Sequence, residues 1–315
     1  MYTKDLSQTK YGINQSLQTA QSWIEPNNPD YFYRGGTRFL NHWIQLQRQR
    51  REEHSAQMDR ITPEVLDIVK TIEEQGYYKI ENFWDTELLD EVKNQTIEMM
   101  RSADPKKVNY PQNGVHTKII HPLKNIPITN KMATHPKIQA IAAAFLGAPA
   151  GLGTTNLRMS TADKSKNVGT NMFHKDFNSP IRLIKFFTYF NDVTKENGPF
   201  TYVKNSNRMM PSDPPWWSIH RWPDDKIESI YGKDRIINLT ANYGDLIVAT
   251  TNGFHKGLKL ESGERLMLTL NYLIHPECGD RGFDAPPEAI HPVLKDTFDD
   301  LAPEDKYLYD FMERV

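Results

Sequence analysis

Two histidines and one aspartate in this sequence have the spacing of a metal site. His174 and Asp176 are separated by one residue, so on an extended strand both side chains leave the same face, with Cα atoms roughly 6–7 Å apart. A third ligand must come from a distant strand that folds back alongside, and His255 lies where we expect such a strand. Two imidazoles and one carboxylate with open positions opposite suit non-haem Fe(II) that activates oxygen. The sequence therefore predicts a metal site at His174, Asp176 and His255.

Arg265 begins a run in which leucines alternate with other residues. Its guanidinium is a planar fork that binds a carboxylate in a bidentate manner. If Arg265 points inward on a strand, Met267, Thr269 and Asn271 share its face, and the leucines pack outward. This face is expected to line a pocket that binds a carboxylate.

The elements around these residues are strands joined by turns. Residues 184–190 form an aromatic, strand-like run, Asn197-Gly198-Pro199 reads as a turn, and residues 200–203 form a second strand. The distal part repeats the pattern, with a turn before His255 and a strand over 266–274. The region from 150 to 276 is therefore predicted to be a strand-rich core.

These blocks resemble the phytanoyl-CoA dioxygenase-like Fe(II)/2-oxoglutarate oxygenases. The shared motifs are Phe173-His174-Lys175-Asp176, the turn over 192–199, Gly244-Asp245, His255-Lys256-Gly257 and Arg265. Upstream, residues 64–83, 86–100 and 135–147 resemble the helices and the strand that precede the family's core. The resemblance implies a mainly β fold with α additions, in which a double-stranded β-helix (jelly-roll, cupin-like) is flanked by N-terminal helices.

The resemblance also implies roles for individual residues. The family's metal ligands fall on His174, Asp176 and His255, and its arginine for the distal carboxylate of 2-oxoglutarate falls on Arg265. Two further cofactor-binding positions fall on Lys118 and Asn156.

Two positions depart from the family pattern. Asn205-Ser206-Asn207 stands where many members have Gly-Ser-His, which puts substrate contacts in doubt. Gly257 stands where a small hydroxyl residue is common, so one hydrogen bond to the cosubstrate is expected to be missing or supplied elsewhere.

The implied activity is that of a dioxygenase using Fe(II), 2-oxoglutarate and O2, which hydroxylates a small-molecule substrate and releases succinate and CO2. Halogenation is disfavoured because related halogenases replace the ligand aspartate, and Asp176 is present. Desaturation, ring closure and demethylation use the same ligands and stay open. Two alternatives are a cupin-like metalloenzyme that does not use 2-oxoglutarate, which Arg265 speaks against, and a non-catalytic binding protein, which the intact ligand set speaks against.

The chain divides into three predicted regions. Residues 1–61 form an irregular arm followed by a helix that could mediate a homodimer, residues 62–276 form the oxygenase domain, and residues 277–315 form a tail of loop with a short terminal helix. A lid-like insertion over 205–235 lacks clear periodicity and carries Trp216 and Trp217, which either pin it to the core or contact substrate.

Two other side chains in these regions could belong to the site. Arg158 shares a polar strand face with Asn156 and Ser160, and is a candidate to bind an anionic group of the substrate. His220 could compete with His255 as third metal ligand, but no strand flanks it.

Composition and charge limit the partners. The formal net charge is −2, and the basic run Arg48-Gln49-Arg50-Arg51 is followed by two glutamates, so we expect a solvated helix face and no nucleic-acid partner. No stretch approaches the roughly 20 apolar residues of a membrane span, and the first residues lack the apolar core of a signal peptide. The single Cys278 excludes an intrachain disulfide and fits a reducing compartment. These features predict a cytoplasmic enzyme without membrane contacts.

Overall fold

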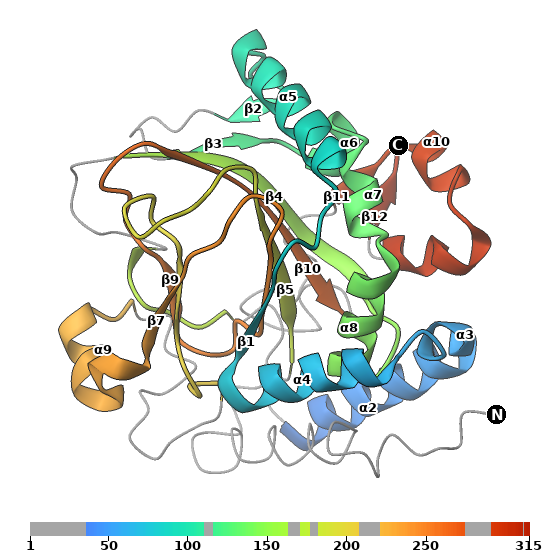
Figure 1. Ribbon diagram of the computed structural model, residues 1–315. Helices are drawn as coiled ribbons and strands as arrows, with labels where there is room; N and C mark the ends of the chain where they lie inside the picture. The colour runs from blue at the N-terminus through green and yellow to red at the C-terminus, as the bar shows by residue number, and fades with distance from the viewer. Residues whose placement is uncertain are drawn as a thin grey trace.

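The computed structural model describes residues 36–109, 116–162, 171–176, 182–207, 221–274, 291–310 and 312–315. Within these ranges two antiparallel sheets face each other, with the strand orders β1-β8-β5-β10-β4-β3-β2 and β7-β6-β9 (Figure 1). The larger sheet contains β1 (Tyr77–Ile80), β2 (Val108–Asn109), β3 (His116–Ile119), β4 (Gly151–Thr161), β5 (Ile184–Tyr189), β8 (Leu246–Ala249) and β10 (Glu264–Leu273). The smaller sheet contains β6 (Phe200–Val203), β7 (Ile236–Leu239) and β9 (His255–Gly257). The prediction of a mainly β, jelly-roll fold with α additions is confirmed.

Strand β10 separates two hydrophobic clusters through its alternating side chains. Leu266, Leu268 and Leu270 belong to the larger cluster, between the sheet and the helices, while Met267 belongs to the cluster between the two sheets. This is the predicted alternation. The alternation continues to Tyr272, which also belongs to the larger cluster, while Asn271 between them is buried but does not line the cavity described below. The register of β10 against β4 shifts between Leu270 and Tyr272.

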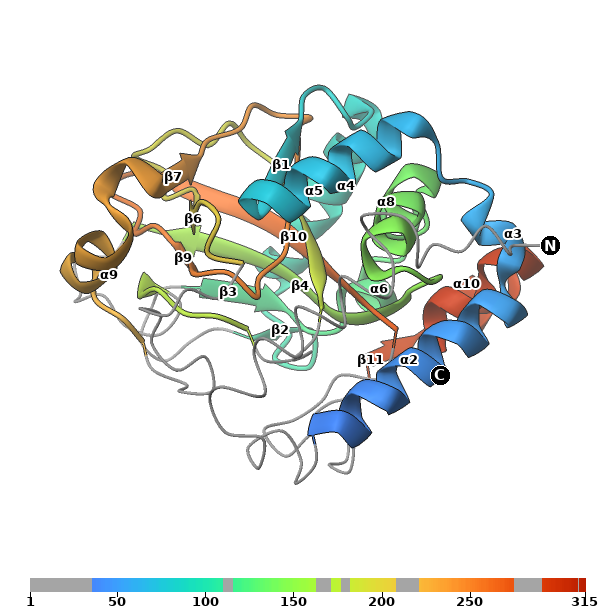
Figure 2. The same ribbon diagram turned by 90° about the horizontal axis from the view of Figure 1, so that it is seen from below.

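Helices cover the outer face of the larger sheet (Figures 1 and 2). Helix α4 (Pro63–Gln75) begins where the Thr62 hydroxyl accepts a hydrogen bond from the backbone N–H of Val65. It ends at Gly76, whose φ of 98° lies in the left-handed region and whose Cα faces the Tyr202 ring too closely for a side chain. Helices on this side also include α5 (Thr86–Ser102), α6 (Pro122–Asn125), α7 (Thr129–Ala133) and α8 (Pro136–Leu146). None of the helices in the described ranges has the length and apolar character needed to cross a membrane.

The helix predicted near residue 37 is present as α2 (Gly36–Glu53), followed by α3 (Ser55–Met58). Its basic run is only partly solvated, which corrects the prediction. Arg50 is buried, and its guanidinium donates to the Pro149 carbonyl at 2.6 Å and pairs with Asp310 at 3.0 Å. Arg51 donates to the carbonyl of Gly147. These arginines therefore attach α2 to the end of α8 and to the C-terminal region, and the homodimer stays a prediction.

The C-terminal region is more ordered than the predicted loop and short helix. It contains β11 (His291–Val293), α10 (Lys295–Asp299), the 3-10 helix η4 (Pro303–Tyr309) and β12 (Met312–Arg314), and β11 pairs with β12 in parallel. Tyr309 is fully buried and donates from its hydroxyl to the Asn130 side chain at 2.7 Å. The region completes the hydrophobic core, because an aromatic run at 307–309 finds an apolar surface that the local sequence does not reveal.

The described end of the insertion over 205–235 is also regular. It contains α9 (Asp224–Tyr231) and the 3-10 helix η3 (Lys233–Arg235), which the aperiodic reading of this stretch did not anticipate. Ile227 and Tyr231 pack against Phe173, Val203 and Phe254. This end of the insertion therefore covers the smaller sheet.

Candidate metal centre

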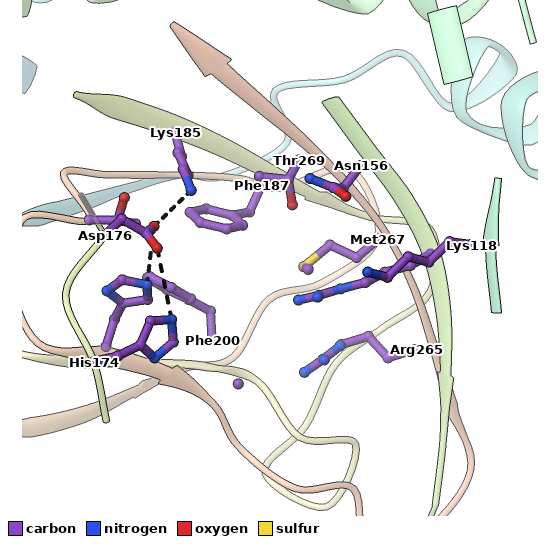
Figure 3. Close-up of a pocket in the computed structure, with 14 residues that line it drawn as sticks. Lys118, Asn156, His174, Asp176, Lys185, Phe187, Phe200, Arg265, Met267 and Thr269 are labelled. Carbon is purple, nitrogen blue, oxygen red and sulfur yellow. Dashed lines mark hydrogen bonds and ion pairs between the residues drawn. The ribbon is translucent and has the colours of Figure 1, made fainter. Parts of the chain in front are cut away.

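Backbone pairing brings the three predicted ligands together. His174 and His255 face each other in an antiparallel bridge, with N–H to carbonyl distances of 3.0 and 2.9 Å in the two directions. The N–H of Asp176 donates to the Thr251 carbonyl at 2.9 Å, which places the carboxylate beside the two rings. The donor atoms of these three side chains all lie within 4.8 Å of one another. We call these three residues the metal triad; Figure 3 shows the Asp176 carboxylate facing the imidazoles.

Each imidazole is oriented by its own backbone. Nδ1 of His174 lies 2.9 Å from the Met172 carbonyl, and Nδ1 of His255 lies 2.9 Å from the Gly253 carbonyl. Because a carbonyl only accepts, Nδ1 carries the proton in both rings and the Nε2 lone pair is free for a metal. The Nε2 atoms lie 3.9 Å (His174) and 3.5 Å (His255) from the Asp176 oxygens. Two imidazoles and a carboxylate fit a divalent iron, and the structure places the three donor groups together.

The charges of the triad agree with this reading. Burial, with a smaller effect of His255, lowers the pKa of His174 to about 3, so this ring is neutral at neutral pH. Burial by itself raises the pKa of Asp176, but the Lys185 ammonium and the two imidazoles lower it well below its usual value. Nζ of Lys185 lies 2.7 Å from Oδ2 of Asp176. Metal binding therefore requires no change of protonation at His174 or Asp176.

Three cationic side chains stand on the opposite side of the cavity, on adjacent strands. Lys118 of β3 is directly opposite Arg158 of β4, which is opposite Met267 of β10, and Arg265 lies opposite Ser160 two pairs further along. We call Lys118, Arg158 and Arg265 the cationic wall; in Figure 3, Arg265 and Lys118 point from these strands toward the triad. Nη2 of Arg265 lies 3.5 Å from the Ser160 hydroxyl, and the buried Nε atoms of both arginines have no hydrogen-bond partner among the described residues. Such unsatisfied donors fit an anionic ligand.

Triad and wall enclose one cavity of about 250 Å³. Every described residue that the sequence predicted for the site lines it, namely Lys118, Asn156, Arg158, His174, Asp176, His255 and Arg265. Trp216, Trp217 and His220 lie outside the described residues. His116, which precedes Lys118 on β3, has its Nδ1 2.9 Å from the Ser160 hydroxyl.

Sequence reasoning missed several lining residues, of which Lys185 has the clearest chemistry. It also missed Phe187, Phe200 and Thr251, and it discussed Gly257 only as a departure from the family. A signal for Lys185 exists, since a lysine alternates with Phe187 and Tyr189 on one face of an otherwise apolar strand. Its pairing with Asp176 could not be identified, because the two residues are nine positions apart in the chain and only the fold brings them together.

The segment that departs from the family pattern has a structural role. The Ser206 hydroxyl accepts a hydrogen bond from the N–H of Phe254 at 2.7 Å, and the Asn207 amide donates to the Glu73 carbonyl at 3.0 Å. Neither side chain lines the cavity, so the departure affects the joint between α4 and the smaller sheet.

Solved structures with similar folds support the architecture. The epimerase SnoN, in complex with Fe3+, alpha ketoglutarate and nogalamycin RO, has a TM-score of 0.52 and 16% identity, and the alignment covers 72% of this chain and 93% of that one. The non-haem alpha-ketoglutarate-dependent carbocyclase SnoK has a TM-score of 0.53 and 15% identity, covering 68% and 85%. EctD from S. alaskensis, with bound Fe, has a TM-score of 0.53 and 17% identity, covering 68% and 76%.

The sequence itself decides the family. No curated protein sequence matches the chain. The profile of the phytanoyl-CoA dioxygenase (PhyH) family matches residues 72–265, more than half of the chain, and the matched region contains the metal triad and the cationic wall. This protein therefore belongs to the phytanoyl-CoA dioxygenase (PhyH) family.

Proposed function

We propose that this protein is an Fe(II)- and 2-oxoglutarate-dependent dioxygenase that hydroxylates an unactivated C–H bond of a small organic substrate. In the balanced reaction, substrate, O2 and 2-oxoglutarate give hydroxylated product, succinate and CO2. The observation that carries this proposal is the presence of two complementary sites in one cavity. His174, Asp176 and His255 would hold iron, and the opposing Arg265 would hold the distal carboxylate of 2-oxoglutarate. Lys118 and Asn156 line the same cavity and would complete the cosubstrate site.

The bound iron would supply oxygen activation, and the chain would supply position and environment. The carbonyls of Met172 and Gly253 keep Nε2 of each imidazole directed at the metal position. Lys185 binds Oδ2 of Asp176 at 2.7 Å and would orient this carboxylate for the metal. Phe187 and Phe200 stack with ring centroids 4.4 Å apart on the cavity lining and limit access of water.

The comparisons support the cofactors more strongly than the reaction outcome. An epimerase and a carbocyclase share this fold, and the epimerase was solved with Fe3+ and alpha ketoglutarate. Hydroxylation is the outcome proposed here because it needs no substrate group besides the C–H bond. A cupin-like enzyme without 2-oxoglutarate is less well supported, because it gives no reason for buried arginines with unsatisfied donors.

The first test is an anaerobic titration of 2-oxoglutarate into Fe(II)-loaded protein, followed by the visible metal-to-ligand charge-transfer band. We expect the band in the wild type, its loss in His174→Ala, and a shift to higher 2-oxoglutarate concentration in Arg265→Gln. Lys226→Gln, an exposed position on α9, serves as the matched control for charge removal. Bound iron without a band would contradict the use of 2-oxoglutarate. If the band appears, incorporation of one oxygen atom from labelled O2 into the product would distinguish hydroxylation from desaturation.

A further inference from the structure

The cavity carries more positive charge than the proposed cosubstrate can balance. Its described lining contains four basic side chains, those of Lys118, Arg158, Lys185 and Arg265, and one acidic side chain, that of Asp176. Asp176 is already paired with Lys185 at 2.7 Å. Among the described residues no carboxylate lies within ion-pair distance of the three cations of the wall. The wall therefore has three positive charges and no negative partner within the part of the chain that the structure describes.

These charges are costly in their present surroundings. Burial, followed by the charge of Arg265, lowers the pKa of Arg158 to about 10, and burial, followed by the charge of Arg158, lowers the pKa of Lys118. Both pKa shifts reflect the unfavourable free energy of holding like charges together away from water. With a pKa of about 10, Arg158 still stays charged at neutral pH. Unpaired buried donors are unfavourable, more so when charged, and among the described residues the Nε atoms of both arginines are in that state. An arrangement of this kind is typical of a binding site for anions.

The cosubstrate accounts for only part of this charge; this step rests on the proposed function. One carboxylate of 2-oxoglutarate would bind the metal, and only the other would reach the wall. A single negative charge would then face Lys118, Arg158 and Arg265. We propose that the substrate is a small organic anion, and that Arg158 binds its anionic group while 2-oxoglutarate occupies the same cavity.

Arg158 is assigned to the substrate because of its place between the other groups. The strand register puts it at the centre of the wall, opposite both Lys118 and Met267, whereas Arg265 lies two pairs further away, opposite Ser160. Burial lowers the pKa of Arg158, and the Asp176 carboxylate opposes this shift. The guanidinium charge of Arg158 therefore interacts with the carboxylate of the triad. A substrate must place its C–H bond at the metal, so its charged group would meet Arg158 first.

The cavity volume restricts the size of this anion. About 250 Å³ is below the roughly 300–1,000 Å³ of typical ligand pockets, and the cosubstrate would occupy part of it. The part of the substrate inside the cavity is therefore a short chain or one small ring with its charged group.

The test uses full-length protein loaded with Ni(II), which does not activate O2, and saturated with 2-oxoglutarate. Calorimetric titration compares propionate with propionamide, its neutral analogue of the same shape. We expect propionate to bind in the millimolar range and propionamide at least about tenfold more weakly, which is the effect of one charge-assisted hydrogen bond. Methyl phosphate in a parallel titration distinguishes a carboxylate site from a phosphate site.

Variants assign the site to a residue. Arg158→Gln should weaken propionate binding about tenfold or more and change the Kd of 2-oxoglutarate less than about threefold. Arg265→Gln should instead weaken the binding of 2-oxoglutarate. Arg158→Lys retains the charge and should restore part of the propionate affinity. Lys226→Gln should change neither, and unchanged far-UV circular dichroism of each variant excludes misfolding as the cause.

Three results would overturn the inference. The first is that propionamide binds as tightly as propionate. The second is that neither propionate nor methyl phosphate binds at about 50 mM. The third is that Arg158→Gln weakens the binding of 2-oxoglutarate as strongly as Arg265→Gln does. The last would assign Arg158 to the cosubstrate. If the metal-loaded wild type fails to bind 2-oxoglutarate, the proposed function fails, and the same titrations without cosubstrate still decide whether Arg158 binds an anion.

Discussion

The two ends of the cavity differ in how their charges are balanced. At the metal triad, the carboxylate of Asp176 has a lysine partner and both imidazoles are fixed by backbone carbonyls. At the cationic wall, the buried Nε atoms of Arg158 and Arg265 have no hydrogen-bond partner in the described ranges. The triad is therefore arranged in advance for a metal, while the wall is completed only by an anion. In a site of this kind the protein alone provides the ligands of the metal, whereas the hydrogen-bond donors of the wall find their partners on small molecules that bind in the cavity.

The two ends also differ in what places them. His174, Asp176 and His255 are positioned by backbone hydrogen bonds between segments far apart in the sequence. The wall is positioned by the register of β3, β4 and β10, with each side chain standing on a regular strand. Substitutions in the triad should thus remove ligands without moving the backbone, and substitutions in the wall should change affinity for anions and leave the metal in place.

The largest effect is expected for Asp176→Asn. The amide is a neutral and weaker ligand, so metal affinity should fall by at least about 100-fold, beyond the 10–100-fold range of changes that only touch a ligand's partner. Competition with a chelator measures the metal Kd. Asp67→Asn, on the exposed side of α4, is the matched control and should bind metal like the wild type. Metal affinity retained in Asp176→Asn would mean that the triad is not the metal site.

Arg265→Gln should show most clearly that the two ends of the cavity bind their ligands independently. Loss of a charge-assisted contact to a carboxylate costs about 1.5–3 kcal/mol, so the Kd of 2-oxoglutarate should rise about 10- to 150-fold. The metal Kd, measured by the same competition assay, should stay within about threefold of the wild type, because Arg265 does not touch the triad. Equal losses of metal and 2-oxoglutarate would show that the two ends are not independent.

Lys185→Met should lower the metal affinity of the triad indirectly, through the loss of the contact to Asp176. Methionine keeps much of the apolar stem and removes the ammonium that lies 2.7 Å from Oδ2 of Asp176. We expect the metal Kd to rise about 10-fold, as for other groups that orient a ligand, together with a shift of the charge-transfer band. Lys185→Arg should recover part of the affinity. An unchanged band and an unchanged metal Kd would remove Lys185 from the site.

The smallest effect concerns the stability of the metal-free protein. The pKa of His174 is lowered to about 3, so below the usual value of 6.5 the unfolded chain binds a proton that the folded protein does not. Stability contributed by the neutral ring is therefore present above pH 6.5 and is lost as the pH falls, with a slope of up to about 1.4 kcal/mol per pH unit. Urea unfolding at pH 7, 6 and 5 should show a flatter profile for His174→Gln. Parallel profiles for variant and wild type would contradict the lowered pKa.

The triad and Arg265 could be found from the sequence because their signals are local. One intervening residue sets His174 and Asp176 on one face, and alternation along 265–270 separates the pocket face from the core face. The alternation did not show where the cavity ends along this strand, since Thr269 lines the cavity and Asn271 does not. The extent of a cavity depends on the neighbouring strands, so the pattern of one strand cannot reveal it.

The remaining features depended on contacts between distant segments. Arg50 looked like part of a solvated basic face, but its guanidinium meets Asp310 on the C-terminal region. Lys185 looked like an isolated charge in an apolar strand, but it pairs with Asp176. By itself the sequence determined the ligand types, their spacing and the strand alternation, because these follow from backbone geometry over a few residues. Only the tertiary structure decided which charges are paired and which are left for a ligand, because a Coulomb interaction depends on distance in space and not on separation along the chain.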